Sequence, residues 1–344
     1  MGFKNLNIAF ENDQRSFWAG TILKGKVKLQ VDSEMSAKAI TLKMIGQCRT
    51  VVVIHRGGRY GGTERFTEST NFFTHELTLW CPSTDGELLQ QGDVQLPFEI
   101  KLPETLPSSF KHQPFNESSA VIDYNAEAKV NHDSSLFRKY PTAYYPFAVY
   151  NAIDCNLEAN LKWKHAMHTE NVGCASLPLT IKASIPRVAY SMSDNIVVDV
   201  ELGTRNAPIR LKAIELRLLK RMRIAAQSKA KVVEIVAMKF RTPASIHLLP
   251  TQTEKLQVAL PLKKRMSPNI ENFDRLNVYY AIQIRAIPLF QCTQPCVEIP
   301  VIMGTIPLRG TQVKAPVPSK QPETSATAQV STWDPSSFPP PLYD

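Results

Sequence analysis

The sequence predicts an all-β protein: two immunoglobulin-like antiparallel β-sandwich domains followed by a disordered, proline-rich tail. Three observations support this fold class. Apolar residues recur at every second position in eight segments, which is the period of a half-buried strand. Turn residues separate these segments, and no helical pattern intervenes between them, which favours β-sandwiches. From Thr311 onward the composition changes to Pro, Ser, Thr and Gln, and the apolar alternation ends.

Four alternating segments lie in the first half of the chain. Each puts apolar side chains on one face of a strand and polar side chains on the other, as in antiparallel sheets with one face in water. The segments are Val27–Val31, Ile40–Met44, Leu96–Leu102 and Ile122–Val130. Turns are expected between them, for example in the glycine-rich run 56–62. The first half is therefore expected to form one sandwich.

Four further segments lie in the second half and predict a second sandwich. They are Leu177–Ile185, Ile196–Leu202, Ile214–Leu218 and Val278–Ile284. The stretch Lys212–Lys231 is rich in Leu, Lys, Arg and Ala, which favour helices. Its apolar residues nevertheless alternate with charged or polar neighbours for most of its length. We therefore expect one long strand there rather than a helix.

The domain boundaries follow from length and from the lapses in alternation. A chain of 344 residues holds about two domains at ~150 residues each. Alternation lapses near 165–173 and resumes at Leu177. The expected organisation is a first sandwich over 1–165, a second over 173–310 and a tail over 311–344. The tail has seven prolines in 34 residues and too little apolar surface to offset the entropy of ordering.

The end of the tail carries a short motif for binding another protein. The last residues, Pro339-Pro-Pro-Leu-Tyr-Asp344, have the form P-P-x-Y. Consecutive prolines hold the backbone near the polyproline II conformation, so little entropy is lost when the segment enters the aromatic-lined groove of a WW domain. The predicted WW-domain-binding residues are Pro340, Pro341, Leu342 and Tyr343.

Charge is unevenly distributed. The chain has a net charge of +9, and residues 173–310 contain 20 Lys and Arg against 9 Asp and Glu. A basic second domain could face an anionic membrane surface, nucleic acid or an acidic peptide, or simply be a solvated face of a sheet. No zinc finger, RNA-binding aromatic signature or basic helix supports nucleic acid. We therefore expect no nucleic-acid partner.

The cysteines and histidines do not predict a metal or cofactor site. The six cysteines are scattered, as expected for reduced thiols of a cytosolic protein. Zinc would need two further ligands beside the pair Cys292 and Cys296, and the pair His165 and His168 has the same lack. No membrane helix or secretion signal is evident either.

Several segments resemble the alpha-arrestins, the arrestin-domain-containing proteins. Gly20-Thr-Ile-Leu-Lys-Gly-Lys-Val-Lys-Leu29 and Ile40–Gly46 resemble the first strands of that fold. Gly92–Pro103, with its Leu-Pro-Phe-Glu-Ile-Lys-Leu-Pro core, is followed by Leu106-Pro-Ser-Ser-Phe110, which is similar to the signature of the N-terminal domain. Ile185–Val198 and Val301–Leu308, which contains Gly-Thr-Ile-Pro-Leu, resemble the start and the end of the C-terminal domain.

The resemblance covers about residues 1–310 and implies a function. It implies a non-catalytic adaptor, cytoplasmic and peripheral at the plasma membrane and endosomes. Such an adaptor binds the cytosolic segments of membrane receptors or transporters. Its tail brings a WW-domain HECT-type ubiquitin ligase to them, so that they are ubiquitylated, endocytosed and sorted.

Two alternatives stay open at this point. A scaffold for endosomal sorting or signalling without ubiquitin would use the basic second domain and leave the tail incidental. An enzyme is the less favoured alternative, because the sequence has no nucleophile elbow, phosphate-binding loop or paired acidic motif at usable spacing. The glycine-rich run 56–62 is expected to be a hairpin tip rather than a binding loop.

Overall fold

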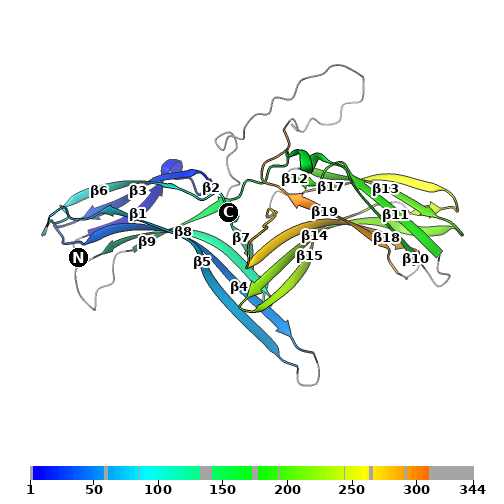
Figure 1. Ribbon diagram of the computed structural model, residues 1–344, viewed down its shortest axis with the longest axis horizontal. Coiled ribbons are helices and arrows are strands. Elements are labelled where there is room, and N and C mark those ends of the chain that lie inside the picture. Colours follow the sequence, from blue (N-terminus) through cyan, green and yellow to red (C-terminus); the bar gives the residue numbers. More distant parts are fainter. Residues whose placement is uncertain are drawn as a thin grey trace, which may run out of the picture.

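In the computed structural model the first half of the chain folds into a β-sandwich (Figure 1). The model describes residues 3–57, 61–84, 86–131, 142–172, 177–192, 194–243, 245–262, 266–289 and 293–309. One sheet has the order β1-β3-β6 and the other β2-β9-β8-β4-β5, with β7 paired to β8. Its strands are β1 (Phe3–Phe10), β2 (Ser16–Trp18), β3 (Ile22–Val31), β4 (Ala39–His55), β5 (Thr63–Trp80), β6 (Gly92–Lys101), β7 (Phe110–His112), β8 (Ser119–Asn131) and β9 (Thr142–Tyr150), and a 3₁₀ turn η1 (Glu11–Asp13) follows β1.

An aromatic cluster joins the two sheets of this first sandwich. The ring of Phe10, at the end of β1, lies 5.8 Å from Phe98 of β6 and 5.6 Å from Phe147 of β9, measured between ring centroids. The alternation predicted for 27–31 is confirmed, because β3 buries every second residue along its length. Burial of this face is the main contribution that holds the sandwich together.

The second half forms a second sandwich of the same kind. One sheet has the order β10-β11-β13-β17, and the other β12-β19-β18-β14-β15, with β16 paired to β14. The elements are the 3₁₀ turn η2 (Glu158–Leu161), β10 (Lys164–Val172), β11 (Leu177–Ile185), β12 (Ala189–Tyr190), β13 (Asn195–Thr204), β14 (Ile209–Ala226), β15 (Lys229–Arg241), β16 (Ile246–Leu248), β17 (Thr253–Pro261), β18 (Leu276–Pro288) and β19 (Cys296–Met303). The all-β fold class with two sandwiches is thus confirmed.

The helix-rich composition of 212–231 does not produce a helix. These residues belong to β14 and to the start of β15, which pair antiparallel from Glu215 opposite Arg241 to Ala226 opposite Lys229. The tight turn between the strands contains Gln227, whose φ is +54°. Burial of one face of β14 against the sandwich overrides the intrinsic preference of Leu, Lys and Arg for helix. The expected strand is correct, but it ends at Ala226 and returns as a hairpin.

The boundary between the sandwiches lies nearer the N-terminus than 165–173. Residues 164–172 form β10, which pairs along its whole length with β11 of the second sandwich. The apolar period is weak there because most residues of β10 are exposed, as Met167 is at 64%. The expected tail, 311–344, lies outside the described residues.

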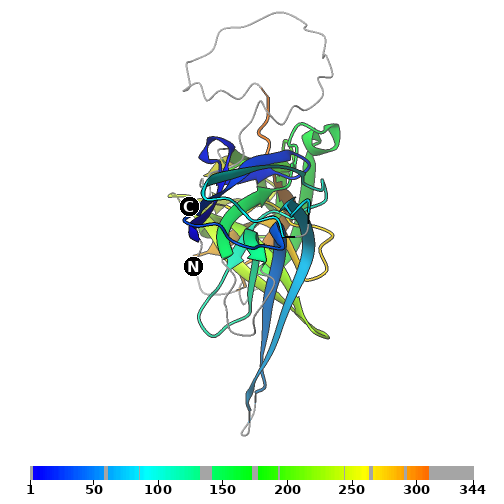
Figure 2. The same ribbon diagram turned by 90° about the vertical axis from the view of Figure 1, so that its left-hand side faces the viewer.

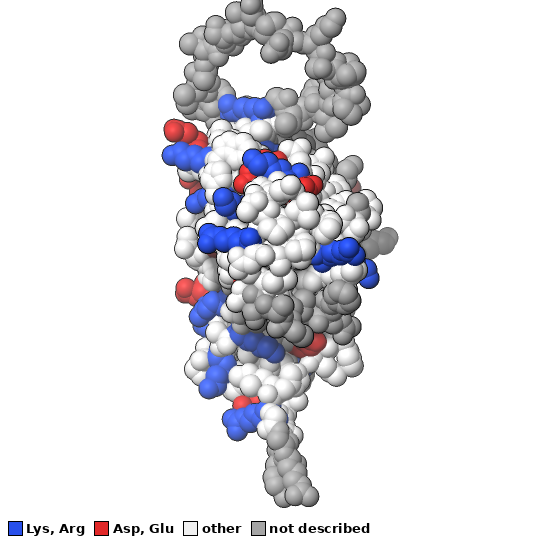
Figure 3. All heavy atoms as spheres, turned by 90° about the vertical axis from the view of Figure 1, so that its right-hand side faces the viewer, with Lys and Arg blue, Asp and Glu red and all other residues white. Residues whose placement is uncertain are grey.

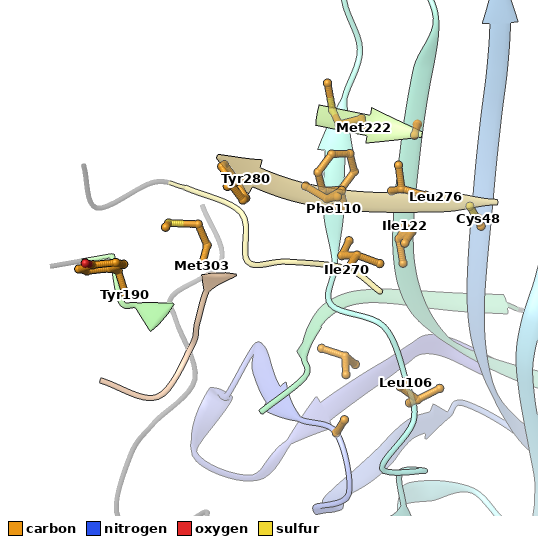
Figure 4. Close-up of a cluster of buried hydrophobic side chains, with 14 of the residues drawn as sticks. Cys48, Leu106, Phe110, Ile122, Tyr190, Met222, Ile270, Leu276, Tyr280 and Met303 are labelled. Atoms are coloured by element: carbon orange, nitrogen blue, oxygen red, sulfur yellow. The ribbon is translucent and has the colours of Figure 1, made fainter. Parts of the chain in front are cut away.

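The two sandwiches lie end to end, with two features on opposite sides of the molecule. The long hairpin β4–β5 projects from the middle on one side, whereas the chain after β19 leaves on the other (Figures 1 and 2). Buried side chains of both domains form one hydrophobic cluster at the middle, including Phe110, Ile122, Met222 and Leu276 (Figure 4). The interface is therefore a continuation of both cores.

Candidate partner-binding sites

The four predicted WW-domain-binding residues, Pro340, Pro341, Leu342 and Tyr343, lie outside the described residues. The structure does show where the tail begins. The Arg309 N–H donates to Asn156 Oδ1 at 2.7 Å, and Asn156 Nδ2 donates to the Pro307 carbonyl at 2.9 Å. The bridge between Asp154 and Ile306 adds a backbone pairing. The tail therefore starts from the segment that connects the two sandwiches.

A row of lysines lies on the outer face of the first sandwich. Lys24, Lys26 and Lys28 of β3 border a cavity of about 600 Å³ between β1, β3 and β6. Lys24 pairs with Glu99 at 3.1 Å, and Lys26 Nζ lies 3.4 Å from Gln95 Oε1. The alternation of β3 that buries its apolar residues places these lysines together. Sequence analysis recognised the strand but not the groove, because β1 and β6 come from distant segments.

A cluster of arginines surrounds one buried carboxylate on the second sandwich. Glu215 of β14 is 1% exposed. Its carboxylate oxygens lie 2.5 Å from Arg217 Nε, 2.8 Å from Arg241 Nη2 and 3.8 Å from Arg285 Nη1. Burial alone would raise the pKa of Glu215, but the hydrogen bonds and charges of Arg217 and Arg241 outweigh it and hold the pKa below its ordinary value.

The arginine cluster leaves a surplus of positive charge. Three guanidinium groups face one carboxylate, and each guanidinium carries five N–H donors. Arg221, on the same strand, adds nothing to this surplus, because it pairs with both Glu234 at 2.6 Å and Glu298 at 2.9 Å. Lys and Arg are spread over the end of the molecule that the second sandwich forms (Figure 3). The excess of basic residues seen in the sequence is therefore partly organised around Glu215.

Polar contacts also join the hairpin β4–β5 to the hairpin β14–β15. Thr50 Oγ1 donates to the Ala225 carbonyl at 2.7 Å, and Lys231 Nζ donates to the Val53 carbonyl at 2.9 Å. Arg275 pairs with Glu68 at 2.5 Å. These contacts join residues more than 150 positions apart, so no local sequence pattern predicts them. They hold the two sandwiches in one arrangement.

One lysine is half-buried at this domain interface. Lys220 of β14 places its ammonium group 4.5 Å from the centroid of the Phe110 ring of β7, a distance at which a cation is attracted to an aromatic face. Burial lowers the pKa of Lys220 to about 8. Burial also lowers the pKa of His112 on β7, and the nearby positive charge of Lys220 lowers it further.

Two cysteines, Cys48 and Cys155, are buried. Burial raises the pKa of both Cys48 and Cys155 to about 12, so neither thiol supplies a thiolate nucleophile at neutral pH. Of the pair Cys292 and Cys296, Cys292 lies outside the described residues and Cys296 is a free thiol. His168 Nε2 lies 3.6 Å from Glu170 Oε2. Within the described ranges no group of three or more potential metal ligands occurs, and no helix is long and apolar enough to cross a membrane.

Comparisons with known proteins match both sandwiches. The model of the arrestin (or S-antigen) N-terminal domain matches residues 6–156, and that of the arrestin (or S-antigen) C-terminal domain matches 175–308. Arrestin domain-containing protein 17 of Caenorhabditis elegans is 23% identical over 314 residues, which cover 87% of this chain and 70% of that protein. Arrestin domain-containing protein 15 of the same organism is 21% identical over 258 residues, covering 70% and 64%. The chain thus spans about two thirds of the length of these relatives.

Proposed function

Because this chain belongs to the arrestin-domain family, with an N-terminal and a C-terminal arrestin domain, whose members are non-catalytic adaptors, we propose that it links membrane cargo to a ubiquitin ligase. Its two sandwiches bind cytosolic segments of membrane receptors or transporters. Its tail binds a WW-domain HECT-type ubiquitin ligase, which ubiquitylates the cargo and promotes endocytosis and endosomal sorting. The P-P-x-Y sequence at 340–343, beyond the last strand of an arrestin fold, is the observation that carries this proposal.

The motif residues have distinct roles in the proposed complex. Pro340 and Pro341 fill the aromatic groove of the WW domain, Leu342 covers its rim and Tyr343 enters the adjoining pocket. Because the tail has one such motif, it engages one WW domain at a time. Tight binding to a ligase with several WW domains then requires that cargo or a second adaptor molecule add contacts.

The two sandwiches offer surfaces for cargo and for a membrane. The hairpin β4–β5 projects from the middle of the molecule (Figure 2), so a partner can approach it without displacing either core. The arginine surplus around Glu215 favours an anionic membrane surface on the second sandwich. Together these features support a cytoplasmic adaptor that works at the plasma membrane and endosomes.

The test of the ligase link is a change in the motif itself. Tyr343→Ala is expected to abolish co-precipitation of WW domains by the full chain, because the pocket for the tyrosine ring is left empty. Phe338→Ala, an aromatic change just before the motif, serves as the matched control and should bind as the parent does. Circular dichroism should show an unchanged β fold for both variants. Undiminished WW binding by Tyr343→Ala would contradict the proposal.

The basic second domain favours one alternative, a sorting or signalling scaffold that does not use ubiquitin. Cells that express the chain without residues 311–344 distinguish the two functions. If the adaptor links cargo to a ligase, cargo ubiquitylation and degradation fall when the tail is removed. If trafficking of the cargo continues unchanged, the scaffold function is correct and the tail is incidental.

A further inference from the structure

An exposed apolar patch lies on the segment that connects the two sandwiches. It consists of Leu157, Leu161 and Trp163, which are 58%, 44% and 53% exposed, and we call it the connector patch. Single exposed apolar residues are ordinary. Here three large ones occur within seven residues, at the turn η2 and just before β10, and such a concentration of exposed apolar side chains is typical of a binding surface.

The patch has a flat aromatic component and a neighbouring cavity. The Trp163 ring lies parallel to the His165 ring, with 10° between the planes and 6.1 Å between the ring centroids. Leu157 also lines a cavity of about 340 Å³ at the domain junction, together with Pro107 and Ile302. Flat aromatic rings with aliphatic borders are the surfaces on which proline-containing segments bind.

The tail of the same chain begins beside this patch. Arg309 is bonded to Asn156, the residue just before Leu157, and 35 residues follow Arg309. The first part of the tail contains Val313, Ala315, Pro316, Val317 and Pro318, and has no acidic residue before Glu323. Seven extended residues can span roughly 24 Å, so this run reaches the patch easily.

We infer that residues 313–318 bind the connector patch within the same chain. A short tether gives the segment an effective concentration in the millimolar range, and its two prolines lower the entropy lost on binding. Pro316 and Pro318 pack against Trp163, and Val313 and Val317 cover Leu157 and Leu161. The root of the tail is then fixed at the connector, and 319–344 extend from there. This inference does not depend on what the P-P-x-Y motif binds.

Trypsin provides an internal comparison in the full chain. Lys314 lies inside the proposed segment and Lys320 lies two residues beyond it. Cleavage follows the population of the open form, so 90% occupancy of the patch slows cleavage after Lys314 about tenfold relative to cleavage after Lys320. Two variants should make the rates equal: Leu161→Ser with Trp163→Ser in the patch, and Val313→Ser with Val317→Ser in the tail.

The tail variant changes no residue of either sandwich, so it keeps the test valid if the patch variant unfolds. Phe115→Ser is the matched control, because Phe115 is 89% exposed on the first sandwich and far from the connector in sequence. It should leave the tenfold difference intact. Equal rates after Lys314 and Lys320 in the unchanged chain would overturn the inference. Protection of Lys314 that grows with protein concentration would also overturn it, because the patch would then bind a second copy of the chain. Protection only in the presence of anionic vesicles would overturn it as well, because the patch would then bind a membrane.

Discussion

At the scale of single residues, Lys220 is a lysine whose surroundings disfavour its charged form. Its ammonium group lies at the domain interface against the Phe110 ring, and it is opposite Tyr280 and Ile235 in the neighbouring strands. The attraction between cation and ring offsets part of the cost of burial. The remaining cost appears as the lowered pKa, about 8 in place of 10.5.

This shift predicts how stability depends on pH. Between about pH 8 and 10.5 the unfolded chain holds the Lys220 proton and the folded chain does not, so this residue makes stability rise with pH. Below pH 8 the full penalty is present and amounts to roughly 3 kcal/mol at most. Lys220→Met should therefore be more stable than the parent at pH 7, and the difference should shrink by pH 10.

Urea unfolding of both proteins at pH 7 and at pH 10 measures this difference directly. The buried tyrosines and thiols titrate equally in the parent and the variant. Lys220 also lowers the pKa of His112, but burial keeps that pKa below pH 7 in both proteins, so the comparison between pH 7 and pH 10 reports on Lys220. Parallel pH profiles for the two proteins would show that Lys220 does not titrate in this range.

At the scale of elements, the sequence predicts strands where one face is buried and the other is in water. β3 and β13 carry that alternation, and their existence is confirmed. β14 is also confirmed as a strand, although most residues on both of its faces are buried. β5 was not predicted, because most of its residues are polar and half-exposed along its length. It forms because β4 offers a free edge with which it can pair. An edge strand is held by backbone hydrogen bonds, and these cannot be predicted from the periodicity of its side chains.

The candidate sites were predictable to different degrees. The P-P-x-Y motif is local, so sequence alone identifies it. The lysine groove and the arginine cluster require the register between strands: Arg241 lies opposite Glu215 because the β14–β15 hairpin turns at Gln227. The connector patch was missed because Leu157, Leu161 and Trp163 lie within the expected first sandwich, where sequence alone does not show which apolar residues are exposed.

Close packing of β3 predicts the effect of one glycine. A Cβ on Gly25 would lie 2.5 Å from the Ala9 carbonyl oxygen and 2.5 Å from the Phe98 ring. Both distances are shorter than a van der Waals contact, so the backbone or the ring would have to move. Gly25→Ala should therefore destabilise the first sandwich by about 1–3 kcal/mol. Gly203→Ala, in β13, is the matched control, because nothing lies within 4 Å of that Cβ position. A denaturant midpoint for Gly25→Ala equal to that of the control would contradict the packing argument.

At the scale of the whole molecule, the pair Glu68 and Arg275 joins the hairpin of one sandwich to the other sandwich. Glu68 also accepts a hydrogen bond from the Gln227 N–H in the β14–β15 turn. The Glu68 and Arg275 side chains are 20% and 34% exposed, so water screens them only partly. The pair is therefore expected to contribute more than an ordinary surface pair.

A double-mutant cycle tests that contribution. The variants Glu68→Ala, Arg275→Ala and the combination should give a coupling energy of about 1 kcal/mol in urea unfolding. Lys24 and Glu99, which pair within the first sandwich and are about half-exposed, are the control and should couple by about 0.5 kcal/mol or less. Equal coupling in the two pairs would show that Glu68 and Arg275 do not hold the domains together.

The distance along the chain between Thr50 and Ala225, which bond across the interface, has a consequence during synthesis. The first sandwich is complete when β9 ends at Tyr150, but β14, which covers its interface side, ends at Ala226, some 76 residues later. At ~5–20 residues per second the apolar surface around Phe110 stays exposed for roughly 4–15 s. Each new molecule therefore passes through an interval in which half of it is folded and open to chaperones or to misassembly.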